Sequence, residues 1–399
     1  MTASETWQWP MAELSAGSAN LILLGIILSI SIGVDALARR WHLPRISLLV
    51  LVGVVWARVQ QLLLGQDGSA PLGAMSEPLI HLALVLVSFL LGGELTVARL
   101  RRNGWLMVAI SLSIVLSGAL LVGVGLWLLG FPLVVVVALA AISVATEPAE
   151  ISDEVQARGD DRLRARLLMG MVAVDDAWGI LLFGLAIALL GWQLTGDGSL
   201  ALAYAGWELG GALLLGLAIG LPAAWLTGRL RPGEPTQVEA FALILLLTGF
   251  STWLDVSGLL AAMLAGALVA NFSSHHTRSF RQIEHIEWPF LVFFFVLSGA
   301  HVDLDYMGAA LWLTLAYIVL RLAGRLMGGA LGVQLTGRGG ELPRDIGLAL
   351  TPQAGIAMGM ALLVVERFPE HRSLLLSAVV ASTVVFEVIA PFLIRRVLR

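Results

Sequence analysis

The residues Met171 to Phe183 read MVAVDDAWGILLF, and this stretch decides the class of fold. Apolar sequence continues on both sides, from position 163 to 191, which is long enough to span a membrane as one helix. A charge at bilayer depth costs roughly 2.5–3.5 kcal/mol on insertion scales. Asp175 and Asp176 are therefore expected to face a cavity or a partner inside a bundle rather than lipid.

The composition of the whole chain also indicates a membrane protein. The 399 residues are 58% hydrophobic and only 13% charged, and the mean hydropathy is +0.89. Soluble domains carry about 25% charged residues. The chain has no cysteine, which excludes disulfides, thiol catalysis and cysteine-based metal sites. All 24 basic residues are arginine, which excludes a lysine Schiff base, and we expect neither a cofactor nor an enzyme.

The hydrophobic pattern predicts an all-α polytopic membrane protein with thirteen spanning helices. The predicted spans are 19–37, 44–64, 78–97, 104–129, 131–156, 163–191, 203–228, 236–253, 256–271, 286–300, 308–335, 343–365 and 373–394.

The arginines predict the orientation. Nineteen of the 24 fall in loops on one side of this arrangement, and only Arg367 and Arg372 fall on the other. The positive-inside rule then puts the N-terminus outside and the C-terminus in the cytoplasm of a plasma (inner) membrane. Residues 1–18 form a polar extracytoplasmic segment without the features of a secretory signal.

Two short matches indicate an internal repeat. Phe89–Gly93 (FLLGG) resembles Phe295–Gly299 (FVLSG) at an offset of 206, and Thr146-Glu147-Pro148 resembles Thr351-Pro352 at an offset of 205. These offsets correspond to seven spans. Because seven is odd, the two six-helix copies face opposite ways, as in the inverted repeats of secondary transporters. The span 203–228 links them.

Pro148 and Pro352 are expected to interrupt corresponding spans near mid-membrane. Proline removes a backbone donor and clashes with the preceding turn. In a single helix an ordinary kink would be the simpler interpretation. In two corresponding helices we expect breaks that cross and expose helix-end dipoles and free carbonyls where an ion can bind.

The buried charges predict an ion pair beside a titrating group. Adjacent residues on a helix point about 100° apart, so Asp175 and Asp176 can have different partners. One can be held ionised by an arginine while the other alternates between a proton and a metal cation. Arg325 is the predicted partner of Asp175; Arg321, one turn earlier, is its rival, with snorkelling as the alternative.

Three glutamates have less certain roles. Glu147 precedes Pro148, where its carboxylate either neutralises the dipole of the following half-helix or joins the ion site. Glu150 lies on the same helical face and is expected to support the site. Glu387, near the middle of span 373–394, is expected to be either a second layer around the ion site or a structural partner of the helix at 308–335.

This set of residues resembles the monovalent cation:proton antiporters of the Na⁺/H⁺ exchanger type. The resemblance covers nearly the whole chain. It is carried by the motifs Val174-Asp175-Asp176-Ala-Trp-Gly179, Thr146-Glu147-Pro148, Gly324-Arg325-Leu-Met-Gly328 and Gly347-Leu-Ala-Leu-Thr351-Pro352-Gln353-Ala-Gly355.

The resemblance implies a homodimer in the lipid bilayer and an elevator-type exchange of Na⁺, Li⁺ or K⁺ for protons. Asp176 would bind the cation, with Na⁺ most expected, and Asp175, Thr146 and Glu147 would complete the site. Arg325, Arg321, Glu150, Thr351 and Glu387 would support it. The implied divisions are dimerisation domains at 19–100 and 233–303, core transport domains at 101–192 and 304–399, and a linker at 193–232.

Three departures from the family pattern leave the stoichiometry open. The electrogenic branch has lysine where this chain has Arg325, which cannot release a proton. The electroneutral branch has asparagine at the position of Asp175, whereas Glu147 resembles the aspartate of that branch. Some members carry a nucleotide-binding regulatory domain, which we do not expect here, and no nucleic-acid partner is expected. The alternative hypothesis is a sodium-coupled symporter of an organic anion on a related inverted-repeat fold.

Overall fold

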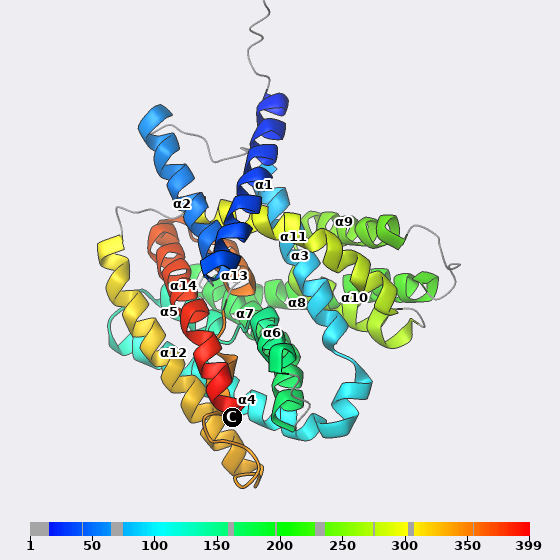
Figure 1. Ribbon diagram of the computed structural model, residues 1–399, viewed down its shortest axis with the longest axis vertical. Coiled ribbons are helices and arrows are strands. Elements are labelled where there is room, and N and C mark those ends of the chain that lie inside the picture. The colour runs from blue at the N-terminus through cyan, green and yellow to red at the C-terminus, as the bar shows by residue number, and fades with distance from the viewer. Residues whose placement is uncertain are drawn as a thin grey trace, which may run out of the picture.

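A computed structural model describes residues 16–41, 43–64, 75–158, 163–195, 198–227, 236–273, 276–301, 307–353 and 355–399. Every regular element in these ranges is a helix (Figure 1). The α-helices are α1 (Ala16–Trp41), α2 (Arg45–Leu64), α3 (Ser76–Glu94), α4 (Val97–Leu128), α5 (Leu133–Ile142), α6 (Pro148–Arg158), α7 (Leu163–Thr195), α8 (Gly198–Thr227), α9 (Thr236–Leu254), α10 (Gly258–Phe272), α11 (His276–Ala300), α12 (Met307–Leu335), α13 (Gly355–Arg367) and α14 (Arg372–Val397).

Eight helices in the described ranges are long and apolar enough to cross a membrane, and several shorter apolar helices accompany them. A helix satisfies its backbone polar groups internally, which lipid cannot do for it. Two helices begin well before their predicted spans: α4 begins at Val97 and α11 at His276. Hydropathy detects only the apolar part of a helix, and the polar first turns of these two continue it beyond that part.

Two of the predicted spans are interrupted. The first consists of α5 and α6, separated by the non-helical residues 143–147, and α6 begins with Pro148 at a position where proline suits a helix start. The second consists of a short 3-10 helix, η3 (Ile346–Leu350), and α13, separated by a segment that includes the non-helical residues 351–353.

The helices pack in two groups. We name α1, α2, α3, α9, α10 and α11 the scaffold group, and α4, α5, α6, α7, α12, α13 and α14 the core group, because each packs mainly within itself. In Figure 1, α9, α10 and α11 lie on one side of the molecule and α12 and α14 on the other. The long helix α8 packs against α10 of the scaffold group and α7 of the core group.

Glycines bring the scaffold helices into backbone contact. Two pairs of helices, α3 with α10 and α2 with α11, approach so closely that a Cβ on any of four glycines would lie about 2 Å from a carbonyl oxygen of the neighbouring helix. The contacts are Gly92 to Met263, Gly266 to Phe89, Gly53 to Val296 and Gly299 to Val50. Small residues allow this approach, which apolar membrane helices use for packing.

The two pairs make the same reciprocal contact. Gly92 and Gly299 are 207 positions apart, as are the acceptors Phe89 and Val296, while Gly53 and Gly266 are 213 apart. The sequence match aligned Gly93 with Gly299, so the structural correspondence differs from it by one residue. Identical residues in a short sequence match therefore align the two helix pairs less accurately than the glycine contacts themselves do.

In the core group, α12 lies along α4. Gly324, Gly328 and Gly332, spaced by four residues, face Gly118, Ile114 and Ile110 of α4. Because these glycines let α12 lie close to α4, they determine how far Arg321 and Arg325 of α12 reach into the core group.

Candidate ion-binding site

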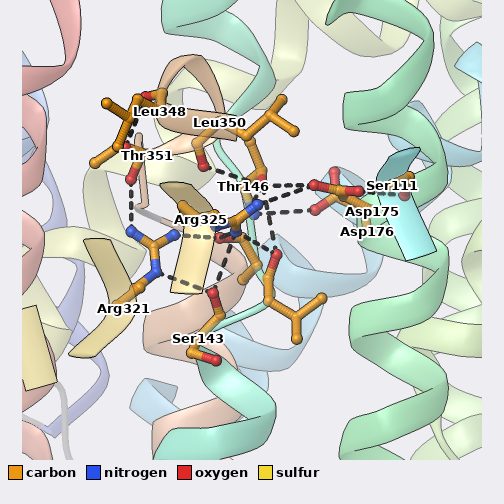
Figure 2. Close-up of polar contacts among 12 residues, drawn as sticks. Ser111, Ser143, Thr146, Asp175, Asp176, Arg321, Arg325, Leu348, Leu350 and Thr351 are labelled. Carbon is orange, nitrogen blue, oxygen red and sulfur yellow. Dashed lines mark hydrogen bonds and ion pairs between the residues drawn. The ribbon is translucent and has the colours of Figure 1, made fainter. Parts of the chain in front are cut away.

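The two interrupted spans touch where they are not helical. The backbone N–H of Glu147 donates to the carbonyl of Pro352 at 2.9 Å, and the Thr146 hydroxyl lies 3.5 Å from the carbonyl oxygen of Leu350. Figure 2 shows this crossing beside α7, which carries the two aspartates.

Asp175 is fully buried and well satisfied. Its Oδ2 accepts from Nη1 of Arg325 at 3.0 Å, and its Oδ1 accepts a hydrogen bond from the Ser111 hydroxyl of α4. Thr146 Oγ1 lies 3.5 Å from Oδ2. The structure thus pairs Asp175 with Arg325 and not with Arg321.

Asp176 is equally buried but has far fewer partners. Its Oδ1 receives one long hydrogen bond, 3.4 Å, from the backbone N–H of Thr146. Its Oδ2 has no hydrogen-bond partner among the described residues. A buried carboxylate oxygen without a donor is costly when charged, so this oxygen is suited to hold a proton or to meet a cation.

The carbonyls at the end of α5 are occupied by arginines. Arg321 donates to Ser143 O at 2.9 Å, to Ala145 O at 2.7 Å and, across the crossing, to Thr351 O at 2.6 Å. Arg325 Nη2 donates to Val144 O at 2.7 Å and to Thr146 Oγ1 at 3.1 Å. The final carbonyls of a helix lack intrahelical donors and carry partial negative charge. The carbonyls of Ser143, Val144, Ala145 and Thr351 therefore accept from arginines, and the expectation of carbonyls free to bind an ion is not met at these residues.

Arg321 neither competes for Asp175 nor snorkels. Its side chain is fully buried, and its guanidinium lies 4.4 Å from the ring centroid of Phe386 on α14. The aromatic face satisfies the side of the cation that makes no hydrogen bond. Arg321 therefore joins the two breaks to each other, through Ser143 and Thr351 (Figure 2). Its contact with Phe386 also joins them to α14.

Comparison with known proteins settles the family. The family description "Sodium/hydrogen exchanger, transmembrane" matches residues 25–399. The chain belongs to this family. It is a multi-pass membrane transporter of the cation/proton antiporter class and not an enzyme.

Individual relatives of this antiporter are distant in sequence and close in fold. The K(+)/H(+) antiporter subunit KhtU of Bacillus subtilis is 25% identical over 291 residues, 70% of each chain. The probable Na(+)/H(+) antiporter GerT of Bacillus cereus is 23% identical over 199 residues, 49% of this chain and 52% of GerT. The structure of the sodium proton antiporter MjNhaP1 from Methanocaldococcus jannaschii at pH 8 superposes with a TM-score of 0.77 at 18% identity, covering 96% of this chain and 99% of MjNhaP1.

The supporting residues of the antiporter lie around the crossing in different ways. Thr351 accepts from Arg321 through its carbonyl, and its hydroxyl bonds back to Leu348 O at 2.7 Å. Glu147 is half-buried and contributes its backbone N–H to the crossing. Glu150 makes no arginine pair among the described contacts; its charged neighbours there are other carboxylates, with Glu387 foremost.

Glu387 directs its described hydrogen bonds to α2, although its helix α14 also packs against α12. Its Oε2 accepts from the backbone N–H of Ser47 at 3.1 Å and from the Ser47 hydroxyl. Ser47 lies in the first turn of α2, where N–H groups have no intrahelical acceptor and the helix dipole favours an anion. This geometry stabilises the carboxylate of Glu387.

Sequence reasoning did not identify three buried polar residues near the site. Ser111 binds Asp175, and Tyr317 donates its hydroxyl to Gln353 Oε1 at 2.9 Å. Gln353 is fully buried, and its Nε2 has no partner among the described residues. The sequence offered only weak indications that these residues belong to the site: Tyr317 lies two turns from Arg325 on α12, and Gln353 directly follows Pro352.

Proposed function

We propose that this antiporter exchanges a monovalent cation for protons by competition of the two ions at Asp176. The observation that carries this is the contrast between the adjacent carboxylates. Asp175 is paired with Arg325, whereas Asp176 has one long hydrogen bond and a bare, buried oxygen. Na⁺ is the first candidate, and Li⁺ and K⁺ are possible; the names of the relatives include both Na⁺ and K⁺ antiporters.

The mechanism follows from what each group can hold. Asp175 stays ionised because the charge of Arg325 compensates it, and Arg325 cannot release its proton. Asp176 loses a proton when a cation takes its place and regains one when the cation leaves, which couples the two fluxes at one carboxylate. Oxygen ligands suit a hard monovalent cation, and Thr146 and Glu147 are the nearest further sources of them.

The thirteen crossings and the inverted repeat belong to the same proposal. The reciprocal glycine contacts of α3 with α10 and of α2 with α11 support two copies of opposite orientation, as do the two breaks that meet at Thr146 and Thr351. The arginine distribution supports an N-terminus outside and a C-terminus in the cytoplasm.

The division into groups supports an elevator movement. Asp176, both arginines and both breaks belong to the core group, so they can move as one body against the scaffold group. The scaffold group would then form the homodimer. Antiport, rather than the symport of an organic anion, is the activity that the family match supports.

The decisive experiment replaces Asp176 by asparagine, which has the same shape and cannot exchange a proton for a cation. In everted vesicles, addition of Na⁺, Li⁺ or K⁺ should relieve the quenching of a pH-sensitive dye for the parent chain and not for Asp176→Asn. The matched control is Asp345→Asn, since Asp345 pairs with Arg396 at the surface. Cation-driven dequenching that survives Asp176→Asn would refute the assignment of the carrier.

A further inference from the structure

A buried carboxylate joins the two helix groups. Glu387 of α14, in the core group, is only 4% exposed, and it binds the first turn of α2, in the scaffold group. Ser47 is 5% exposed, so water does not replace the bond. Two ion pairs with more exposed partners also join the groups: His81 of α3 with Glu366 of α13, and Arg367 of α13 with Asp255, which lies between α9 and α10. Apolar contacts, such as Leu84 of α3 against Gly359 of α13, accompany them.

The neighbour of Glu387 connects this contact to the ion site. Phe386, the preceding residue on α14, packs its ring on the guanidinium of Arg321. Adjacent helical residues point about 100° apart, so α14 presents Phe386 to the crossing and Glu387 to the scaffold. One segment of α14 therefore contacts both the crossing, within the core group, and α2 of the scaffold group.

The contact is also opposed by its surroundings. Glu150 and Glu147 lie close enough to Glu387 to repel its charge. The bond to α2 offsets this repulsion in the present conformation. Glu147, Glu150 and Glu387 all belong to the core group, so the repulsion persists when that group moves, whereas the bond to α2 has to break if Asp176 moves with the core group.

We propose that the bond between Glu387 and the first turn of α2 holds the core group in the conformation described here, and that its rupture limits the movement of Asp176 between the two sides of the membrane. This rests on the proposed elevator function. Glu387 is then a positioning residue, which sets the rate of exchange and not the affinity for the cation.

The absence of cysteine makes the conformation measurable. Leu84 is 3% exposed and lines a cavity of about 220 Å³ between the groups, next to Arg367 at the end of α13. A Leu84→Cys chain would carry one thiol, and its reaction with a membrane-impermeant reagent from the extracytoplasmic side reports how often the groups separate there. A hydrogen bond to a charged group is worth roughly tenfold or more in an equilibrium constant.

The proposal predicts that Ser47→Ala and Glu387→Gln each raise the rate of thiol modification by about tenfold. Because the Ser47 hydroxyl acts through the carboxylate of Glu387, the effects of the two substitutions should not add in the double variant. Ser47→Thr, which keeps a hydroxyl, should restore the parent rate. The control is Ser382→Ala, because the Ser382 hydroxyl bonds only within its own helix, to Val379 O. In transport assays, the KM for the cation should stay constant while the maximal rate changes.

An unchanged modification rate together with a lower melting temperature would overturn the proposal and leave a purely structural contact. The same assay in an Asp176→Asn background reads the conformation without any transport. A failure of the proposed ion exchange would therefore appear in the vesicle experiment and not in this one.

Discussion

The scaffold group and the crossing in the core group are held together by opposite kinds of contact. In the scaffold, glycines let backbones touch, and the close contacts of α3 with α10 and of α2 with α11 involve no charge. At the crossing, two buried arginines and two buried aspartates fill the space that the broken helices leave. The glycine contacts of the first region depend on shape, whereas the crossing depends on satisfied charges, which can respond to an ion.

The largest effect is expected at the residue that satisfies both breaks. Arg321→Met removes three charge-assisted hydrogen bonds, to the carbonyls of Ser143, Ala145 and Thr351. Thr351 O loses its arginine donor, whereas Ser143 O and Ala145 O keep longer bonds of 3.2 Å from Arg325. Since a hydrogen bond to a charged group contributes about 1.5–3 kcal/mol, we expect a loss of at least about 3 kcal/mol. Thermal unfolding in detergent measures it. Arg338→Gln is the control, because its pair with Glu341 is exposed and worth at most about 1 kcal/mol. Equal melting temperatures would show that Arg321 does not hold the crossing.

The second effect tests the scaffold. Gly266→Ala places a Cβ about 2 Å from the carbonyl oxygen of Phe89, and backbone cannot rotate away as a side chain can. Overpacking of this kind costs about 1–3 kcal/mol. Gly249→Ala on α9 is the matched control, since nothing lies within 4 Å of its Cβ position. If both variants melt at the same temperature, the contact of α3 with α10 is looser than described.

The smallest effect separates charge from geometry at the ion pair. Arg325→Lys keeps a cation beside Asp175 and loses the second nitrogen, which binds Val144 O and Thr146 Oγ1. Loss of these bonds should cost about 1–2 kcal/mol, and exchange should continue. Dye dequenching and melting temperature measured on the same preparation test both parts. A stable variant without exchange would mean that exchange needs the bonds of the guanidinium to Val144 O and Thr146 Oγ1 and not only its charge.

Much of the fold could be predicted because hydropathy and proline act locally. The membrane class, the two interrupted spans and the aspartate pair in α7 follow from short stretches of sequence. The pairing of Asp175 with Arg325 was predictable as well, since few arginines lie deep in apolar segments. The helix starts were less predictable, as at α11, because its first turns are polar.

The function of the broken ends was harder to predict. Free carbonyls at a helix break suggest an ion site, and nothing near Ser143 or Val144 in the sequence indicates that arginines about 180 positions away occupy those carbonyls. The same applies to Gln353 and Tyr317, whose hydrogen bond exists only once α12 lies against the second break.

The sequence by itself determined that this protein lies in a membrane, that it is helical, and on which carboxylate exchange is proposed to depend. Each of these follows from composition and spacing within one segment. Only the tertiary structure decided which groups those charges meet. Glu387 and Ser47 are 340 positions apart, and a buried charge takes whichever donor the packed helices bring within about 3 Å. Such partners are a property of the assembled bundle, since no single helix contains them.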